Sequence, residues 1–194
     1  MSKRNAILAV ATRLFSQNGF QGTAMAELST LTGAATGTIF HHFKNKEDLF
    51  LQVLKDVKET LIEKLDHEQT GNGNRNGMAA VMDGVGFYLH LAGSLEDQVL
   101  ILHRHFPYQM AETCTECRDH LEAIYNGLLD IFERGIRRGL ADGSIHVEDP
   151  RRTAMVLFAM VDGIVRLHTY RVYDAGTLYD SLMTACRRLL GGEA

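Results

Sequence analysis

TGTIFHHF, residues 36–43, decides the fold because it fits the last helix of a helix-turn-helix unit. Ile39 and Phe43 stand four residues apart, so both would face the core from one side of a helix. Polar side chains are left to face outward, namely Thr36, Thr38, His41 and His42. In such a unit this helix enters the major groove of DNA, whose base edges carry distinct donors and acceptors. The same spacing also fits a three-helix packing unit that binds no ligand.

Two further helices are expected before this segment and a long one after it. The first shows apolar residues at helical spacing and stops at Gly19. Thr23 would cap the second helix, which Gly33 ends. Asn45 would cap the long helix, predicted over 46–68, whose first turn is acidic and therefore suits the helix dipole.

The remaining sequence keeps a helical pattern to its end. The expected helices cover 78–91, 95–105, 112–138, 150–173 and 176–190. Pro107 would stop one of them, and Asp149 would cap another that has Pro150 at its first position. The one break in composition is QTGNGNRNG, residues 69–77, which predicts an exposed loop. No long stretch alternates as a strand would, so we predict an all-α fold with about nine helices.

Charge is distributed unevenly along the chain. Residues 1–46 contain five lysines and arginines against one acid, Glu27, although the net charge of all 194 residues is −4. A basic head on an acidic body is typical of a module that binds a polyanion. We therefore predict a helix-turn-helix DNA-binding domain at 1–46 and a second helical domain at 47–194, which begins with a connecting helix at 47–68.

The composition argues against several classes of protein. Hydrophobic residues are 45% and charged residues 23%, which is typical of a globular chain. No apolar run approaches the roughly 20 residues of a membrane helix, and the N-terminus lacks a signal-peptide cleavage pattern. Three cysteines argue against a disulfide framework, so we expect a cytoplasmic protein. No nucleophile motif or carboxylate pair stands out, so we expect neither an enzyme nor a cofactor.

Two segments resemble the TetR family of transcriptional regulators. The first runs without a gap over residues 5–50, from NAILAVATRLFSQNGF at 5–20 to GTIFHHFKNKEDLF at 37–50. The second combines RGLADGSIHVEDPRRTA at 138–154 with MVDGIV at 160–165. The resemblance implies a homodimer with one helix-turn-helix unit per subunit. It also implies a ligand cavity in each C-terminal body, which makes that body the ligand-binding and dimerisation domain.

The resemblance also assigns DNA contacts by position. They fall on Thr23, Thr36, Gly37, Thr38, Phe40, His41, His42 and Lys46. Phe40 stands where the family usually has a tyrosine whose hydroxyl reaches a phosphate, so that contact is lost here. Ala35 stands where a serine usually caps the recognition helix. Thr36 is the candidate to take over this cap, which would divert its hydroxyl from DNA.

Together these features predict a ligand-responsive repressor that binds a pseudo-palindromic double-stranded DNA operator as a homodimer. An effector would favour a conformation in which the two recognition helices are wrongly separated for successive major grooves. We expect a small, mostly apolar effector, because Phe and Met side chains offer contact area without fixed polar geometry. The predicted pocket residues are Met82, Phe87, His90, Leu91, Tyr125 and Phe158. His90 and Tyr125 are the polar groups expected to orient the ligand.

The dimer interface is expected on the last two helices. Their repeating faces carry Met155, Phe158, Ala159, Leu167, Leu178, Leu182 and Ala185. A pair from each subunit would form a four-helix interface. Asp162 and Gly163 favour a close helix approach at this interface, although Asp162 could also line the cavity or face solvent.

Two other interpretations remain open at this point. An all-α small-molecule carrier would share the helical body, but it has no reason to concentrate positive charge at its N-terminus. A metal or thiol sensor would use Cys114, Cys117 and His120, which stand at successive i, i+3 positions, with His103 or His105 as a fourth ligand. One such cluster without a second CxxC pair is more often structural, so no metal ligand is predicted.

Overall fold

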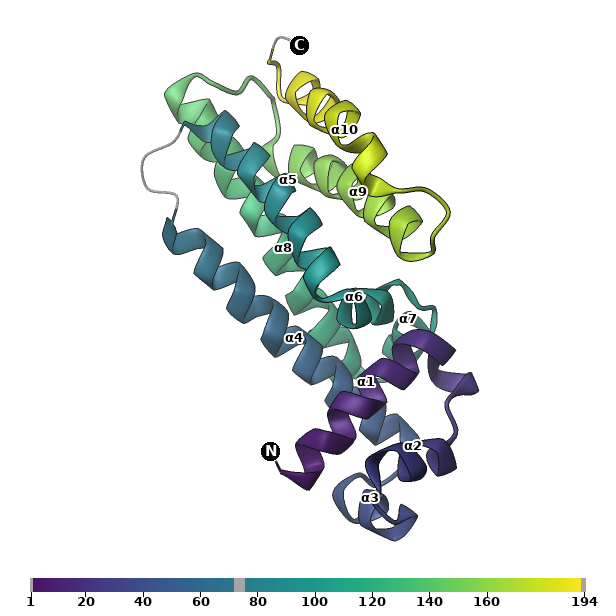
Figure 1. Ribbon diagram of the computed structural model, residues 1–194. Coiled ribbons are helices and arrows are strands. Elements are labelled where there is room, and N and C mark those ends of the chain that lie inside the picture. The colour runs from purple at the N-terminus through teal and green to yellow at the C-terminus, as the bar shows by residue number, and fades with distance from the viewer. Residues whose placement is uncertain (1, 72–75, 193–194) are drawn as a thin grey trace. The chain divides into compact units, whose positions relative to one another are not determined.

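Ten α-helices and no strand make up residues 2–71 and 76–192, which the computed structural model describes (Figure 1). They are α1 (Lys3–Gly22), α2 (Met25–Thr32), α3 (Thr36–His42), α4 (Lys46–Gly71), α5 (Gly77–Ser94), α6 (Glu96–His103), α7 (Phe106–Ala111), α8 (Thr115–Asp142), α9 (Pro150–Thr169) and α10 (Ala175–Leu189). The all-α prediction is confirmed. Of the loop predicted at 69–77, residues 72–75 lie outside the described residues, and α4 continues through the first three positions.

The helices form two compact units. Unit 1 comprises Met1–Leu61 and Leu95–Ala123, and unit 2 comprises Ile62–Ser94 and Ile124–Ala194. Two long helices, α4 and α8, each begin in unit 1 and end in unit 2. Helices α6 and α7 therefore fold with the N-terminal helices, although they lie far from them in sequence. The predicted domain boundary after residue 46 stays a prediction.

The prediction that Pro107 stops a helix is wrong, and this accounts for the tenth helix. The chain leaves α6 at His103 and starts α7 at Phe106, so that Pro107 lies within the first turn of α7. Proline is well suited to this place because the first turn has no internal partner for its amide and φ is already near −65°. Pro107 is buried in unit 1.

Aromatic packing forms the core of unit 1. The rings of Phe15 and Phe50 meet edge to face with centroids 5.2 Å apart, and Phe20 stacks on Phe106 of α7 at 3.6 Å. Helix α1 bends at Gly19, whose φ of 71° is outside the helical region and is tolerated by glycine. The bend leaves carbonyl groups of α1 without helical partners.

Arg104 binds those carbonyl groups. Its Nε donates a hydrogen bond to the Ser16 carbonyl oxygen at 2.9 Å, and its Nη2 donates to the Gln17 carbonyl oxygen at 2.8 Å. Helix α1 also packs along α6, as Figure 1 shows. Helix α1 and the α6–α7 corner are thereby tied together inside unit 1.

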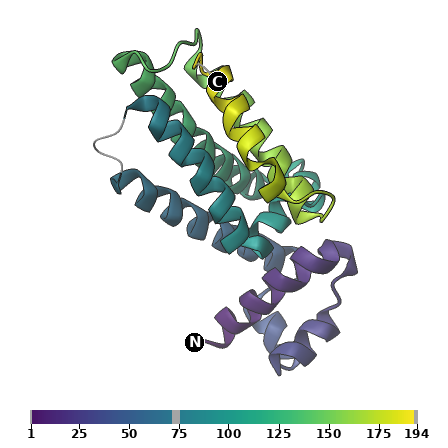
Figure 2. The same cartoon turned by 45° about the horizontal axis from the view of Figure 1, so that its top comes forward.

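Unit 2 is built on helices α5, α8, α9 and α10. Asp149 caps α9 by accepting a hydrogen bond from the Arg152 amide at 3.0 Å, with Pro150 in the first turn, as predicted. Arg151 ties α9 to α8 through Asp130 at 2.8 Å and Glu133 at 2.9 Å. Helices α9 and α10 lie side by side in both ribbon views (Figures 1 and 2). Their other faces meet α5.

Candidate nucleic-acid interface

The turn and recognition helix of the predicted helix-turn-helix unit are formed by α2 and α3. Gly33 ends α2 in the left-handed region with φ of 64°, and α3 begins three residues later. Ile39 and Phe43 are 0% and 1% exposed, so the predicted inward face of the segment is confirmed. The opposite face of α3 is therefore the one left to solvent.

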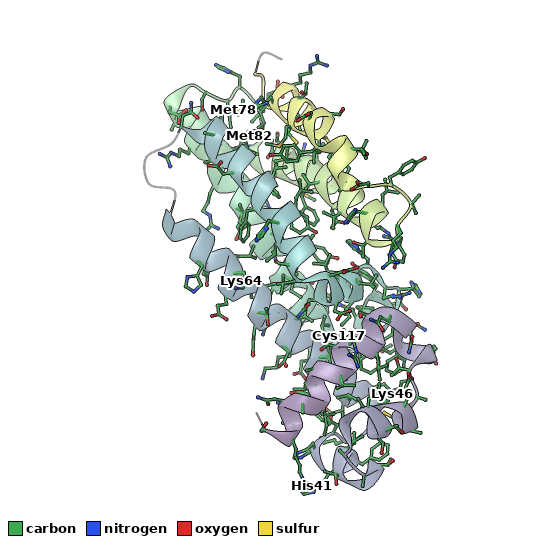
Figure 3. The ribbon with its side chains drawn as sticks, in the orientation of Figure 1. His41, Lys46, Lys64, Met78, Met82 and Cys117 are labelled. Atoms are coloured by element: carbon green, nitrogen blue, oxygen red, sulfur yellow. The ribbon has the colours of Figure 1, made fainter. Side chains whose placement is uncertain are left out.

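That outward face carries most of the residues expected at DNA. Thr36, Gly37, Phe40, His41 and His42 are exposed, and Thr38 is half-buried. His41 projects from the outer end of α3, as Figure 3 shows. Ala35 is the N-cap residue of α3 and makes no side-chain cap. No hydrogen bond from the Thr36 side chain is found among the described residues, so the suggested diversion of its hydroxyl to capping does not occur.

Thr23 departs from its predicted roles. Ala24, and not Thr23, is the N-cap residue of α2. The Thr23 side chain is 2% exposed, and its hydroxyl contacts the carbonyl oxygens of Gly19 at 2.8 Å and Leu14 at 3.1 Å. These two hydrogen bonds hold the Thr23 side chain against α1, on the inside of the bend at Gly19. A contact between this side chain and DNA is inconsistent with that geometry, so we remove it from the candidate site.

The start of α4 follows the predicted capping. Asn45 Oδ1 accepts a hydrogen bond from the Asp48 amide at 2.7 Å, while Asp48 Oδ2 accepts one from the Lys44 amide at 2.8 Å. Such reciprocal bonds fix the first turn of a helix. They hold Lys46 at a defined place beside the end of α3.

Lys46 also contacts the aromatic core of unit 1. Its Nζ lies 4.6 Å from the ring centroid of Phe20, within cation–π distance. The side chain is half-buried, and burial lowers the pKa of Lys46 from its usual value. The contact restrains the Lys46 side chain before any ligand binds. A phosphate contact would therefore cost less conformational entropy than one made by a freely rotating lysine. Figure 3 labels Lys46 and, farther along α4, Lys64.

Two of the residues predicted to line the effector pocket, Tyr125 and Phe158, contact each other within unit 2. Tyr125 and Phe158 meet edge to face with centroids 5.9 Å apart. Tyr88, which the sequence reasoning missed, lies 5.7 Å from Phe158 and donates a hydrogen bond to Asp162 Oδ1 at 2.6 Å. Asp162 therefore has a partner within its own unit. Its spacing from Tyr88 in sequence gave no signal of this pairing.

The other predicted pocket residues differ in how far their side chains are buried. Met82 and Leu91 are 7% and 2% exposed, and Phe87 is half-buried. His90 is exposed, which does not fit its expected place inside a cavity. It lies on α5 between the half-buried Leu89 and the buried Leu91, so the helical rotation turns it toward solvent.

The cysteine and histidine cluster does not form a metal centre. Within residues 2–71 and 76–192, no three His, Cys, Asp or Glu side chains are grouped so as to hold a metal ion. The buried Cys117 thiol donates to the Pro107 carbonyl oxygen at 3.4 Å. Burial is the main cause that raises the pKa of Cys117 to about 11, so the thiol stays protonated at neutral pH.

Cys117 should therefore react slowly with thiol reagents. We expect iodoacetamide at pH 7.5 to alkylate the half-buried Cys114 well before Cys117, because the thiolate is the reactive form. Cleavage after Glu116 separates the two cysteines, so mass spectrometry can follow each one. Equal rates of alkylation would contradict the burial of Cys117 and would restore the thiol-sensor interpretation.

No single helix in the described part of the chain is long and apolar enough to cross a membrane. Only α5 and α6 taken together, as a broken pair, reach the required length and composition.

The chain is similar in sequence to known bacterial transcriptional regulators. Residues 7–53 match the family described as "Bacterial regulatory proteins, tetR family". The fatty acid metabolism regulator protein of Bacillus subtilis is 25% identical over 180 residues, which cover 91% of this chain and 90% of that protein. The HTH-type transcriptional regulator QacR of Staphylococcus aureus is 26% identical over 171 residues, 85% of each chain.

Solved structures share the fold. A tetR-family bacterial regulatory protein from Rhodococcus RHA1 superposes over 100% of both chains with a TM-score of 0.81 and 16% identity. The transcriptional regulator FadR from Bacillus subtilis, solved in complex with stearoyl-CoA, has a TM-score of 0.73 and 20% identity over 98% of this chain and 99% of that chain.

Proposed function

We propose that this chain is a member of the TetR family of bacterial transcriptional regulators and acts as a ligand-responsive repressor that binds a two-fold symmetric operator. The observation that carries this proposal is α3. It buries Ile39 and Phe43 while it leaves its small and polar side chains in solvent. We propose residues 1–46 as the DNA-binding domain and 47–194 as the ligand-binding and dimerisation domain.

The proposed base contacts come from Thr38 and His41. Both residues stand on α3, and their hydroxyl and imidazole groups can pair with base edges in the major groove. Thr36, Gly37, His42 and Lys46 are proposed to contact the phosphate backbone, which fixes the register of the helix but carries no sequence information. Phe40 is 45% exposed and lacks the hydroxyl of a tyrosine, so we propose that it makes only apolar contact with DNA.

Lys46→Ala should weaken binding to all DNA sequences by about the same factor. The removed charge neutralises one phosphate, so the slope of log affinity against log salt should flatten by about one unit. Fluorescence anisotropy at several salt concentrations measures both quantities. Lys64→Ala removes the same charge from the same helix in unit 2 and serves as the control. An unchanged salt slope for Lys46→Ala would exclude the phosphate contact.

We propose that the homodimer forms through α9 and α10. The exposed residues of α9 include an apolar stripe, which is Met155, Val156, Ala159, Gly163 and Leu167, next to the exposed polar side chains Arg152, Arg166 and His168. An apolar stripe of this kind is expected where two copies pack as an isologous interface. Leu182, which the sequence placed on the interface, is 4% exposed and belongs to the core of unit 2. Its predicted role at the interface is therefore wrong.

We propose that a small, mostly apolar effector binds in unit 2 near Tyr88, Tyr125 and Phe158. The three rings offer apolar contact, and the hydrogen bond from Tyr88 to Asp162 places one polar group among them. The stearoyl-CoA bound to the Bacillus FadR structure is a relative's ligand with a long apolar chain. The effects of the two ligands on each other are reciprocal. If the effector lowers the affinity for DNA by some factor, the DNA-bound protein must bind the effector more weakly than the free protein does by the same factor.

Selection of bound sequences from a random DNA pool tests the proposed function. The recovered sequences should share two inverted half-sites whose centres are separated by about one helical turn or a multiple of it. Titration of apolar compounds against the resulting complex then tests the effector. Recovery of DNA without any shared motif would contradict the proposal.

A further inference from the structure

The recognition helix α3 carries a phenylalanine that is exposed to solvent. Phe40 is 45% exposed, whereas the other eight of the nine phenylalanines are buried or half-buried. Within residues 2–71 and 76–192, its ring makes no contact with another aromatic ring or with a cationic group. A solvated ring of this size gains free energy when an apolar surface covers it.

The helix leaves open space beside this ring. Thr36 and Gly37 precede Phe40 by four and three residues, so they share its side of α3. Gly37 has no side chain, and a Cβ atom there would meet no heavy atom within 4 Å. Thr36 is exposed and its side chain is short. A ligand surface can therefore approach the Phe40 ring across the preceding turn of the helix.

The chemistry of the ring restricts what it can recognise on DNA. Phenylalanine has no hydrogen-bond donor, no acceptor and no charge, so it cannot pair with a phosphate oxygen or with a polar base edge. The apolar group that the major groove presents is the C5-methyl group of thymine. A phenyl ring on the helix that enters this groove therefore matches one of the four bases.

We propose that Phe40 reads one thymine in each half-site of the operator by covering its C5-methyl group. This assignment rests on the proposed function, because it requires α3 to lie in the major groove. It adds a base contact to those proposed for Thr38 and His41, and this contact depends on apolar surface alone. Of the two pyrimidines of DNA only thymine carries the methyl group, so cytosine should be disfavoured at this position.

Replacement of thymine by uracil in the selected operator tests the assignment. Uracil lacks only the methyl group, so base pairing is retained. Thymines are replaced one symmetric pair at a time, and fluorescence anisotropy measures the affinity of the full-length protein for each duplex. At one pair the affinity should fall about ten-fold, because each half-site loses one covered methyl group. An operator in which no such replacement weakens binding would overturn the proposal.

Matched variants assign the uracil effect to one side chain. Phe40→Ala should bind the unmodified operator more weakly and should no longer distinguish uracil from thymine at this pair. Phe40→Tyr keeps the ring and should keep the uracil effect. Leu31→Ala removes another exposed apolar side chain, 49% exposed on the neighbouring helix α2, and should keep the effect as well. Circular dichroism confirms that each variant folds. An undiminished uracil effect in Phe40→Ala would assign the methyl group to another residue and would overturn the proposal.

Failure of this inference and failure of the proposed function give different results. Equal affinity of the unmodified protein for the operator and a scrambled duplex would contradict the proposed function itself. A protein that prefers its operator but is insensitive to every uracil replacement would contradict only the assignment of Phe40.

Discussion

Ala159→Arg should convert the homodimer into monomers and lower affinity for the operator by two orders of magnitude or more. Ala159 lies in the exposed apolar stripe of α9, so a dimer that buries this stripe would have to bury two unpaired guanidinium groups, one from each copy. Losing the link between two half-site contacts removes the avidity of the dimer, a factor of about 10² to 10⁴. Sedimentation velocity and fluorescence anisotropy measure the two effects.

Ala141→Arg is the matched control for this experiment. Ala141 is, like Ala159, an exposed alanine of unit 2, but it belongs to α8 and is not part of the apolar stripe of α9. This variant should stay dimeric and should bind the operator as the unmodified protein does. A dimeric Ala159→Arg protein with full operator affinity would place the interface elsewhere.

Gly77→Ala should lower the free energy of unfolding by about 3 kcal/mol or more. A Cβ atom at Gly77 would lie 2.0 Å from the backbone nitrogen of Gly139 and 2.6 Å from the carbonyl oxygen of Gly135. These are backbone atoms, so no change of rotamer can relieve the overlap. The start of α5 would have to move away from α8. It would then strain the hydrogen bond from the Gly77 amide to Asp142 Oδ2, which is 2.7 Å long.

Gly86→Ala, on the same helix, should change the free energy of unfolding in the opposite direction. A Cβ atom at Gly86 meets no heavy atom within 4 Å, and the position is inside α5. Alanine there should stabilise the protein by about 0.5–1 kcal/mol, because it reduces the conformational freedom of the unfolded chain. Chemical denaturation followed by circular dichroism compares the two variants. Equal stabilities would contradict the close approach of α5 and α8.

Local signals were sufficient to predict much of the fold. The four-residue spacing of Ile39 and Phe43 is a property of one helix, and the structure buries both. Asn45 and Asp149 cap the helices that follow them because each cap depends on the three residues after it. Gly33 ends α2 because the left-handed conformation favours glycine.

Features that depend on distant residues could not be predicted in this way. Pro107 fits both the end of one helix and the start of another, and the packing of α7 in unit 1 selects the second. Thr23 turns inward because of the bend in α1, which periodicity alone does not show. Leu182 and Ala159 share a similar pattern on their helices, but only the tertiary arrangement separates core from surface.

In the candidate sites, too, local features could be predicted from the sequence, and features that depend on distant residues could not. The outward residues of α3 could be predicted, because a recognition helix is defined by its own two faces. The pairing of Tyr88 with Asp162 joins residues 74 positions apart. Such a pairing leaves no periodic pattern in the sequence.

The most direct test of the central claim is the affinity of the intact protein for its selected operator and for a scrambled duplex of equal length, measured at physiological salt. A regulator that reads bases through α3 should prefer the operator by a factor of about 10³ or more. Equal affinity for the two duplexes would contradict sequence-specific recognition and, with it, the proposed function.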